Sequence, residues 1–349
     1  MSGSLRRYLD PLRELTLARF REQLRQPEVL FWVFAFPVLL ALALGLAFRN
    51  RPAETIHVAV ESGPGAEALL DDLQATGGFA ASVVSPEVAQ EELRTGQVAL
   101  VVVPGDSLVY RFDPTRSDSR LARLATDNAL QRAEGREDVR VTRDRLVTQR
   151  GARYIDFLIP GLLGLNLMST GMWGCGYSVV DARRRKLMKR LLASPMRRSQ
   201  YLLSFISARL ILLLPEVVVL LGFAAAVFGV PVRGSVLSLG VVALLGAMCF
   251  AGMGLLTASR AQTAEAVSGL MNLVMLPMWV LSGVFFSSSR FPAAMQPFIR
   301  ALPLTALNDA LRGVMIEGAS LGALAVPLAI CALWGGASFA LALRVFRWH

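Results

Sequence analysis

Glu216 is an acid within a long apolar run, which is an unusual place for a charged side chain. An ionisable group at bilayer depth is costly, and such groups commonly mark a substrate path or a proton relay. Arg209 precedes it by seven residues, about 10 Å along a helix, and this spacing predicts no direct pair. We expect Arg209 to extend toward the membrane surface instead. Asn166 and Asn272, in two other apolar runs, are the candidates to line a polar substrate path with Glu216.

Acid–base and nucleophilic catalysis lack their usual residues in this sequence. Glu216 has no histidine or second carboxylate beside it in the apolar runs, and His57 and His349 are isolated. The three cysteines each lie within an apolar run, without the spacing of metal ligands. We therefore expect neither a metal site nor a membrane-embedded enzyme. A structural role, as an acid hydrogen-bonded at a helix interface, remains the alternative for Glu216.

A phosphate-binding loop is absent from the sequence. The motif G-x-x-x-x-G-K-[S/T] needs a glycine followed by a lysine. The chain's lysines, Lys186 and Lys189, follow Arg185 and Met188. We therefore expect the chain to bind no ATP itself and not to be an enzyme, so ATP-driven work would require a separate subunit.

A short basic segment separates two of the apolar runs. Eight arginines and lysines lie between Asp181 and Leu203. Residues 182–193 are predicted to form a short helix with one apolar face, which ends before Ser194 and Pro195. The predicted contact with a cytoplasmic partner comprises Arg184, Arg185, Lys186, Leu187, Met188, Lys189, Leu191 and Leu192. A basic loop that only sets membrane topology is the alternative.

Six apolar runs, each long enough to cross a bilayer as a helix, predict an α-helical polytopic membrane protein. The runs are 29–48, 154–180, 205–228, 236–258, 266–286 and 321–343. Charged residues make up 18% of the chain, below the roughly 25% of soluble domains. The first run is longer than a signal-peptide core and has no cleavage site after it, which predicts a retained span. The basic residues flank apolar runs, so the net charge of +10 does not predict a nucleic-acid partner.

Residues 49–153, between the first two spans, have the composition of a soluble domain. Ile56–Val60 and Gln97–Pro104 are rich in β-branched residues and predict strands, whereas 65–74 and 86–96 predict helices. This alternation predicts an α/β or α+β domain. A long helical stretch, interrupted near Gly135, would return the chain to the membrane.

Basic residues in the short flanks predict that both termini and the 182–193 segment are cytoplasmic. The 49–153 domain is then extracytoplasmic. So is the apolar, proline-containing stretch 287–312, for which we expect short re-entrant helices. Residues 1–28 predict an amphipathic helix on the cytoplasmic membrane surface, with its arginines, Arg19 among them, near the lipid headgroups.

Four sequence blocks, in this order, resemble the ABC-2 type permease family, the membrane subunits of ATP-binding cassette exporters. The blocks are YIDFLIPGLLGLNLM, RRRKLMKRLLASPMRRSQYL, LSGVFF and LPLTALNDALRGVM. The resemblance covers nearly the whole chain. It implies that 182–193 is the coupling helix that docks on an ATPase, that 1–28 is the connecting helix, and that 287–312 forms the outer re-entrant helices.

The same resemblance implies a homodimer in the bacterial inner (plasma) membrane that works with two copies of a separate ABC ATPase subunit. That subunit would bind ATP and magnesium. The substrate path would run between the two permease copies, surrounded by membrane lipid. The apolar spans favour an amphiphilic or lipid-like substrate or a drug. A non-transporting membrane anchor or scaffold that presents its outer domain to a partner is the alternative function.

Overall fold

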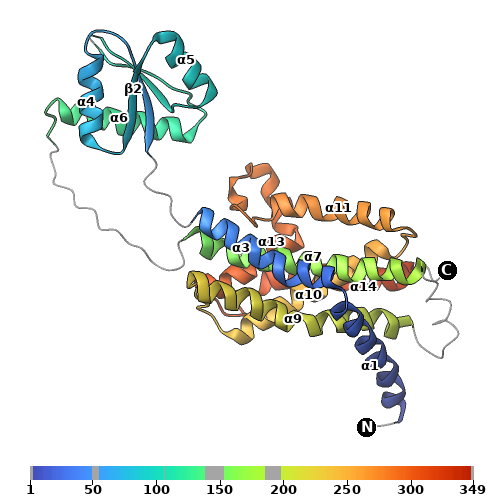
Figure 1. Ribbon diagram of the computed structural model, residues 1–349. Helices are drawn as coiled ribbons and strands as arrows, with labels where there is room; N and C mark the ends of the chain where they lie inside the picture. Colours follow the sequence, from blue (N-terminus) through green and yellow to red (C-terminus); the bar gives the residue numbers. More distant parts are fainter. Residues whose placement is uncertain (1–2, 49–54, 106, 138–152, 185–197, 347–349) are drawn as a thin grey trace. The chain divides into compact units, whose positions relative to one another are not determined.

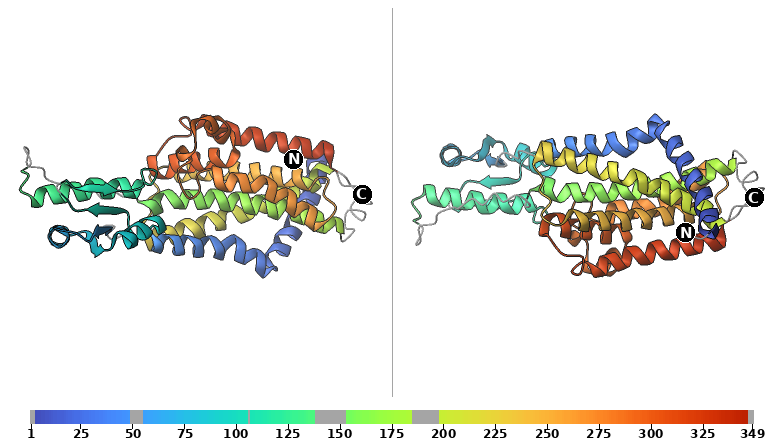
Figure 2. Two further views of the ribbon diagram at one scale, coloured as in Figure 1. Left: turned by 90° about the horizontal axis from the view of Figure 1, so that it is seen from above. Right: turned by 90° about the horizontal axis from the view of Figure 1, so that it is seen from below.

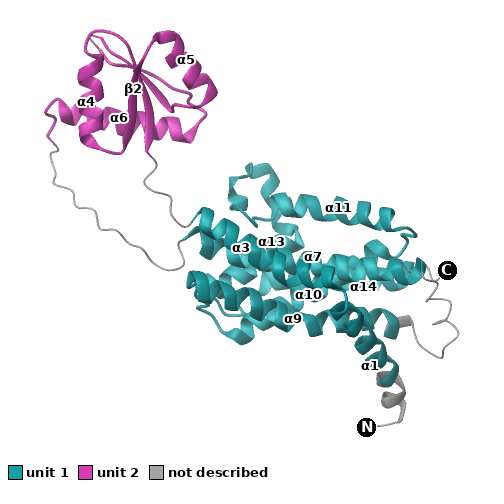
Figure 3. Ribbon diagram, viewed as in Figure 1, with its two compact units in different colours: residues 1–49, 148–349 teal, residues 50–147 magenta. Residues whose placement is uncertain are grey.

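The protein contains two compact units, shown in different colours in Figure 3. The computed structural model describes residues 3–48, 55–105, 107–137, 153–184 and 198–346. The helical unit consists of Met1–Arg49 and Thr148–His349, and the α/β unit of Asn50–Val147. The α/β unit thus interrupts the helical unit in sequence, between its first and second long helices.

A four-stranded sheet forms the centre of the α/β unit (Figure 1). Its strands are β1 (Ile56–Glu61), β2 (Phe79–Val84), β3 (Leu100–Val103) and β4 (Val109–Arg111). The spatial order is β2-β1-β3-β4, with β1 parallel to both of its neighbours and β4 antiparallel to β3. Because helices α4 (Ala66–Thr76) and α5 (Pro86–Thr95) connect the parallel strands, the unit is α/β, one of the two predicted alternatives.

Helices cover both faces of this sheet. Helices α4 and α6 (Ser117–Ala133) pack on the face where Val58 and Val60 are fully buried. Helix α5 packs on the opposite face, against Ala59 and Val101. Successive residues of β1 therefore enter two different cores, because side chains alternate along a strand and a parallel strand is buried on both sides.

Among the described residues of the helical unit, six helices are long and apolar enough to cross a membrane, as the sequence predicts. The first span, Pro27–Ala47, combines α2 (Pro27–Leu30), the π-helical segment η1 (Phe31–Ala35) and α3 (Phe36–Ala47). The others are α7 (Tyr154–Arg184), α9 (Arg198–Phe228), α10 (Val236–Ala258), α11 (Ala264–Leu281) and α14 (Ala325–Val345). Helix α10 coincides with its predicted run, and the other spans differ from theirs by one to seven residues at one or both ends.

Helix α7 runs through the middle of the helical unit (Figure 2). It packs against α3, α9, α10, α11 and α13. Glycines bring α7 and α10 close together: a Cβ at Gly254 would lie 2.7 Å from the Met172 carbonyl oxygen, and one at Gly171 would lie 2.8 Å from the Phe250 Cβ. Small residues at such crossings permit the tight packing that stabilises helices in a membrane.

Short helices fill the stretch between the fifth and sixth spans. Two 3-10 turns, Ser288–Arg290 and Ala293–Met295, precede α12 (Gln296–Ala301) and α13 (Pro303–Arg312). Pro297 and Pro303 lie in the first turns of α12 and α13, where proline costs no helical hydrogen bond. Helix α13 is mostly buried, and its membrane depth remains a prediction.

Helix α1 (Gly3–Leu24) packs against the beginning of α9. Arg19 Nε donates to Ser204 Oγ at 2.8 Å, and its guanidinium lies 3.2 Å from the centroid of the Phe205 ring. Arg19 therefore contacts α9, and its predicted position near the lipid headgroups stays a prediction. A hydroxyl and an aromatic face of α9 are close enough to bind this cation inside the protein.

We predict that Gly254→Ala lowers the thermal stability of the purified protein in detergent. The new methyl group would overlap the backbone of α7, and such overpacking typically costs about 1–3 kcal/mol. Gly240→Ala, on the same helix, is the matched control, since a Cβ there meets no atom within 4 Å. Equal melting temperatures for the two variants would contradict the close contact of α7 with α10.

Candidate functional site

An ion pair is buried inside the helical unit. Arg209 Nη2 lies 2.6 Å from Glu216 Oε2, and the two side chains are 3% and 0% exposed. Two predictions are therefore wrong: that the seven-residue spacing excludes a pair, and that Arg209 extends to the membrane surface. The two long side chains together cover the roughly 10 Å between their turns of α9. Arg209 pairs with the carboxylate of Glu216 inside the protein and does not extend to the membrane surface.

Thr170 of α7 connects this ion pair to a second span. Its Oγ1 accepts a hydrogen bond from Arg209 Nη2 and lies 3.3 Å from Glu216 Oε1. The same hydroxyl lies 2.7 Å from the backbone carbonyl oxygen of Asn166. Its single proton satisfies one of these two acceptors at a time. Glu216 thus has polar contacts on two helices.

Asn166 extends the contacts to the first span. Its Nδ2 donates to the backbone carbonyl oxygen of Val33 at 3.1 Å. Val33 lies in the π-helical segment η1, and such turns within α-helices are frequent at functional sites. We call Val33, Asn166, Thr170, Arg209 and Glu216 the three-span network, because these residues link spans one, two and three.

The charges within the three-span network compensate each other. A single charge buried in such surroundings would be far more costly than a pair, so each member of the pair depends on the other. Arg209 Nε and Nη1 have no hydrogen-bond acceptor among the described residues, which makes the Glu216 carboxylate the main partner of the guanidinium. The described residues contain no group of three or more potential metal ligands.

The three predicted path residues are brought together only in part. Asn166 and Glu216 meet through Thr170, whereas Asn272 lies on the exposed side of α11, outside the three-span network. Asn166 and Glu216 are buried, so in this structure they hold helices together and do not line an open path.

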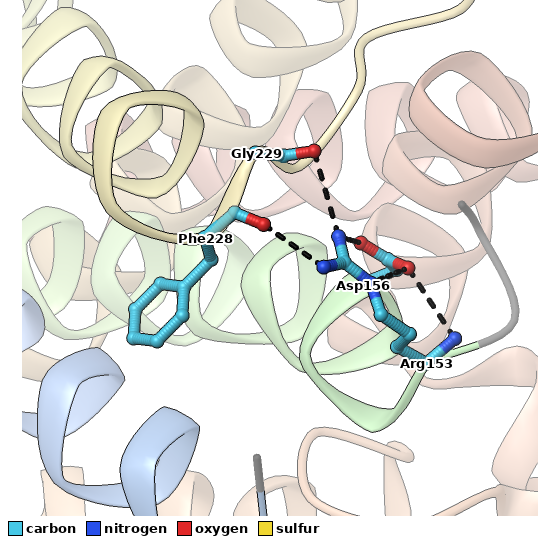
Figure 4. Close-up of polar contacts among 4 residues, drawn as sticks. All are labelled: Arg153, Asp156, Phe228 and Gly229. Atoms are coloured by element: carbon cyan, nitrogen blue, oxygen red, sulfur yellow. Dashed lines mark hydrogen bonds and ion pairs between the residues drawn. The ribbon is translucent and has the colours of Figure 1, made fainter. Parts of the chain in front are cut away.

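Arg153 joins the beginning of α7 to the end of α9 (Figure 4). Its Nη1 donates to the Phe228 carbonyl oxygen at 3.0 Å, and its Nη2 donates to that of Gly229 at 3.4 Å. The Asp156 carboxylate lies 2.8 Å from Nη2, and this hydrogen bond raises the pKa of Arg153. A permanent positive charge at a helix carboxyl end is favourable, because the helix dipole is negative there.

Helix α13 holds the end of α11 in a similar way. Arg312 donates to the Gly283 carbonyl oxygen, and its guanidinium lies 3.7 Å from the centroid of the Phe157 ring. Asn308 Nδ2 donates to the Ser282 carbonyl oxygen at 3.0 Å. The unpaired carbonyls at the end of α11 thus receive donors from a different helix.

The predicted coupling residues lie mostly outside the described residues. Arg184 is the last residue of α7 and is exposed. The remaining seven are Arg185, Lys186, Leu187, Met188, Lys189, Leu191 and Leu192, and none of them is described. A separate coupling helix at 182–193 therefore stays a prediction, with 182–184 forming the last turn of α7.

A family model described as ABC-2 family transporter protein matches residues 27–344, which is nearly the whole chain and includes all six spans. The chain belongs to the ABC-2 family. The resemblance found in the sequence is thereby confirmed. Together with the six long apolar helices, the family match makes this ABC-2 protein a multi-pass membrane protein.

Two relatives cover different shares of this ABC-2 protein. ABC transporter G family member 20 of Dictyostelium discoideum is 28% identical over 172 residues, which is 49% of this chain and 23% of that relative. Nodulation protein J of Bradyrhizobium diazoefficiens (strain JCM 10833 / BCRC 13528 / IAM 13628 / NBRC 14792 / USDA 110) is 29% identical over 202 residues, which is 56% of this chain and 75% of that relative. The match thus spans less than a quarter of the first relative and three quarters of the second.

Sequence reasoning missed Thr170 and the Val33 carbonyl. Thr170 follows Asn166 by four residues, which places both on one face of α7, and this spacing was the available signal. The sequence could not predict the Val33 carbonyl as a hydrogen-bond acceptor, because every residue carries a backbone carbonyl whatever its side chain.

We predict that removing one charge of the buried pair, by Arg209→Met or by Glu216→Leu, destabilises the ABC-2 protein by about 3–5 kcal/mol. Each change leaves the opposite charge buried without its partner. The double variant should recover most of the loss, because no charge then remains. Melting temperatures of the three variants in detergent test this expectation, and a double variant less stable than either single variant would contradict it.

Proposed function

We propose that this ABC-2 protein is the membrane-spanning permease subunit of an ABC-type exporter in a bacterial inner (plasma) membrane. The observation that carries this proposal is the family match across all six spans. In this proposal ATP and magnesium bind to a separate ATPase subunit, an assignment supported by the match to the ABC-2 family, whose members are the membrane-spanning subunits.

In this proposal two copies of the permease pair with two copies of the ATPase subunit. The coupling helix at 182–193 docks on the ATPase from the cytoplasmic side, where both chain termini also lie. The α/β unit is extracytoplasmic. ATP binding drives a change between two states of the permease only if it stabilises one state more than the other. The docked coupling helix provides the contact through which ATP binding stabilises one state of the permease more than the other.

The proposed substrate is amphiphilic, lipid-like or a drug, and it crosses between the two copies. Helix α11 supports this assignment, since it exposes large apolar side chains such as Leu273 and Leu276 together with the polar Asn272. Among the three candidate path residues, Asn272 is the one that a substrate can reach in the described structure. Asn166 and Glu216 contribute by holding spans one to three in place.

We predict that the triple variant Leu187→Asp, Leu191→Asp and Leu192→Asp loses stimulation of the ATPase subunit but still inserts in the membrane. Three carboxylates would replace the apolar face that docks on the partner. The measurement is the ATPase activity of the co-purified complex. Cell fractionation shows whether the variant permease is inserted in the membrane.

A matched control replaces the exposed Leu121 and Leu124 of α6 by Asp and should keep full stimulation. Full stimulation in the triple variant would contradict docking through this face. A stable permease that neither co-purifies with an ATPase nor transports would favour the membrane-anchor function instead.

We also predict that a cysteine placed at Lys186 reacts with a membrane-impermeant maleimide added from the cytoplasmic side. The three native cysteines are buried and free, so they give little background. Reaction from the opposite side of the membrane would contradict both the proposed topology and the docking of residues 182–193 on a cytoplasmic ATPase.

A further inference from the structure

Arg183, in the last turn of α7, binds the backbone at the end of another span. Its Nη1 donates to the Ala258 carbonyl oxygen at 3.2 Å and also to that of Ala261, and its Nη2 donates to the Ser259 carbonyl oxygen at 3.1 Å. These carbonyls belong to the end of α10 and to the connection between α10 and α11. One guanidinium thus reaches the last carbonyl of α10, that of the capping residue Ser259 and one in the connection that follows.

The chemistry of this contact is specific to arginine. Carbonyls at a helix end lack an intrahelical donor and carry the negative end of the helix dipole. A planar guanidinium offers five N–H donors in fixed directions, whereas a lysine ammonium is a compact point charge. Arg183 therefore holds the end of α10 at a defined distance and orientation from α7.

The same side chain also contacts the region that follows the sixth span. The Arg183 guanidinium lies 5.2 Å from the centroid of the Phe346 ring, one residue beyond α14. At Arg183, therefore, the end of span two meets the ends of spans four and six and the connection to span five. Arg184, the last residue of α7, directly follows Arg183, and residues 185–197 then connect α7 to α9.

The opposite end of that segment is fixed to a different group of helices. At the beginning of α9, Ser204 and Phe205 bind Arg19 of α1, and α1 leads into the first span. Residues 185–197, which hold most of the predicted coupling helix, thus follow Arg183 and precede the residues of α9 that bind Arg19. A displacement of that stretch would act on Arg183 on one side and on the beginning of α9 on the other.

We infer that Arg183 is a positioning residue that passes movement of the 182–193 segment to α10 and α11. This inference rests on the proposed function, because it needs an ATPase that moves the segment. If Arg183 were only a cap for α10, its loss would lower stability but leave the response to ATP intact. If Arg183 passes movement on, its loss leaves ATP hydrolysis intact but abolishes the ATP-dependent rearrangement of α11.

The experiment uses the complete complex of permease and ATPase subunit in proteoliposomes. A cysteine replaces the exposed Ser289, which lies in the stretch that follows α11, and its reaction rate with an impermeant maleimide is measured with and without ATP plus vanadate. In the parent we expect the trapped state to change this rate. In Arg183→Ala we expect ATP hydrolysis to continue while the change in rate is lost.

Three comparisons make the result decisive. Arg344→Ala removes an exposed arginine from the last turn of α14 and should respond like the parent. Arg183→Lys keeps the charge without the planar donors and should lose most of the response. Should Arg183→Ala fail to assemble, Arg183→Gln, which keeps an amide donor, is measured in the same way.

An undiminished response to ATP in Arg183→Ala, or in the glutamine variant, overturns the inference and leaves the proposed function intact. A parent complex that hydrolyses ATP without any change at residue 289 also overturns the inference alone, whereas a parent permease that neither assembles with an ATPase subunit nor stimulates ATP hydrolysis overturns the proposed function. Assembly and ATP hydrolysis of the parent complex therefore show whether the proposed function fails or only the inference about Arg183.

Discussion

A polar group inside an apolar helical bundle needs its partner within the protein, and the polar contacts of the helical unit follow from this constraint. Helix ends are the most demanding places, since their last carbonyls have no donor in the same helix. Arg153, Arg183 and Arg312 each supply donors to the end of a helix other than their own. Three arginines thereby fix the ends of α9, α10 and α11, and two of them come from α7 or the residue before it.

Helix α7 is consequently the element on which the arrangement of the others depends. Its glycines bring α10 close, Asn166 and Thr170 reach the first and third spans, and Arg183 binds the end of α10. The buried pair of Arg209 and Glu216 makes the helical unit depend on both residues, because either charge buried without the other lowers stability. Such a pair holds spans one to three together as long as both partners remain.

This arrangement gives the proposed transport cycle a mechanical basis. The coupling segment, residues 182–193, would include Arg183, which binds the end of α10 and the connection to α11, and the first turns of α9 bind α1. Helix α11 has mainly exposed apolar residues along one side, whereas the network among spans one to three is buried.

Composition and periodicity determined the six spans, the domain between the first two, and the ABC-2 resemblance, because these features depend on long runs of residue types. Strand β2 escaped prediction, since half of the residues in Phe79–Val84 are alanine or serine, and such residues form a strand here because β1 supplies the pairing. The Arg209–Glu216 pair and the contacts of Arg183 also required the tertiary structure. Arg209 and Glu216 both lie on α9, but burial and Thr170 of α7 decide that their side chains extend toward each other. The contacts of Arg183 depend on which backbone carbonyls of another helix come within hydrogen-bonding distance. Spacing along one helix does not contain that information.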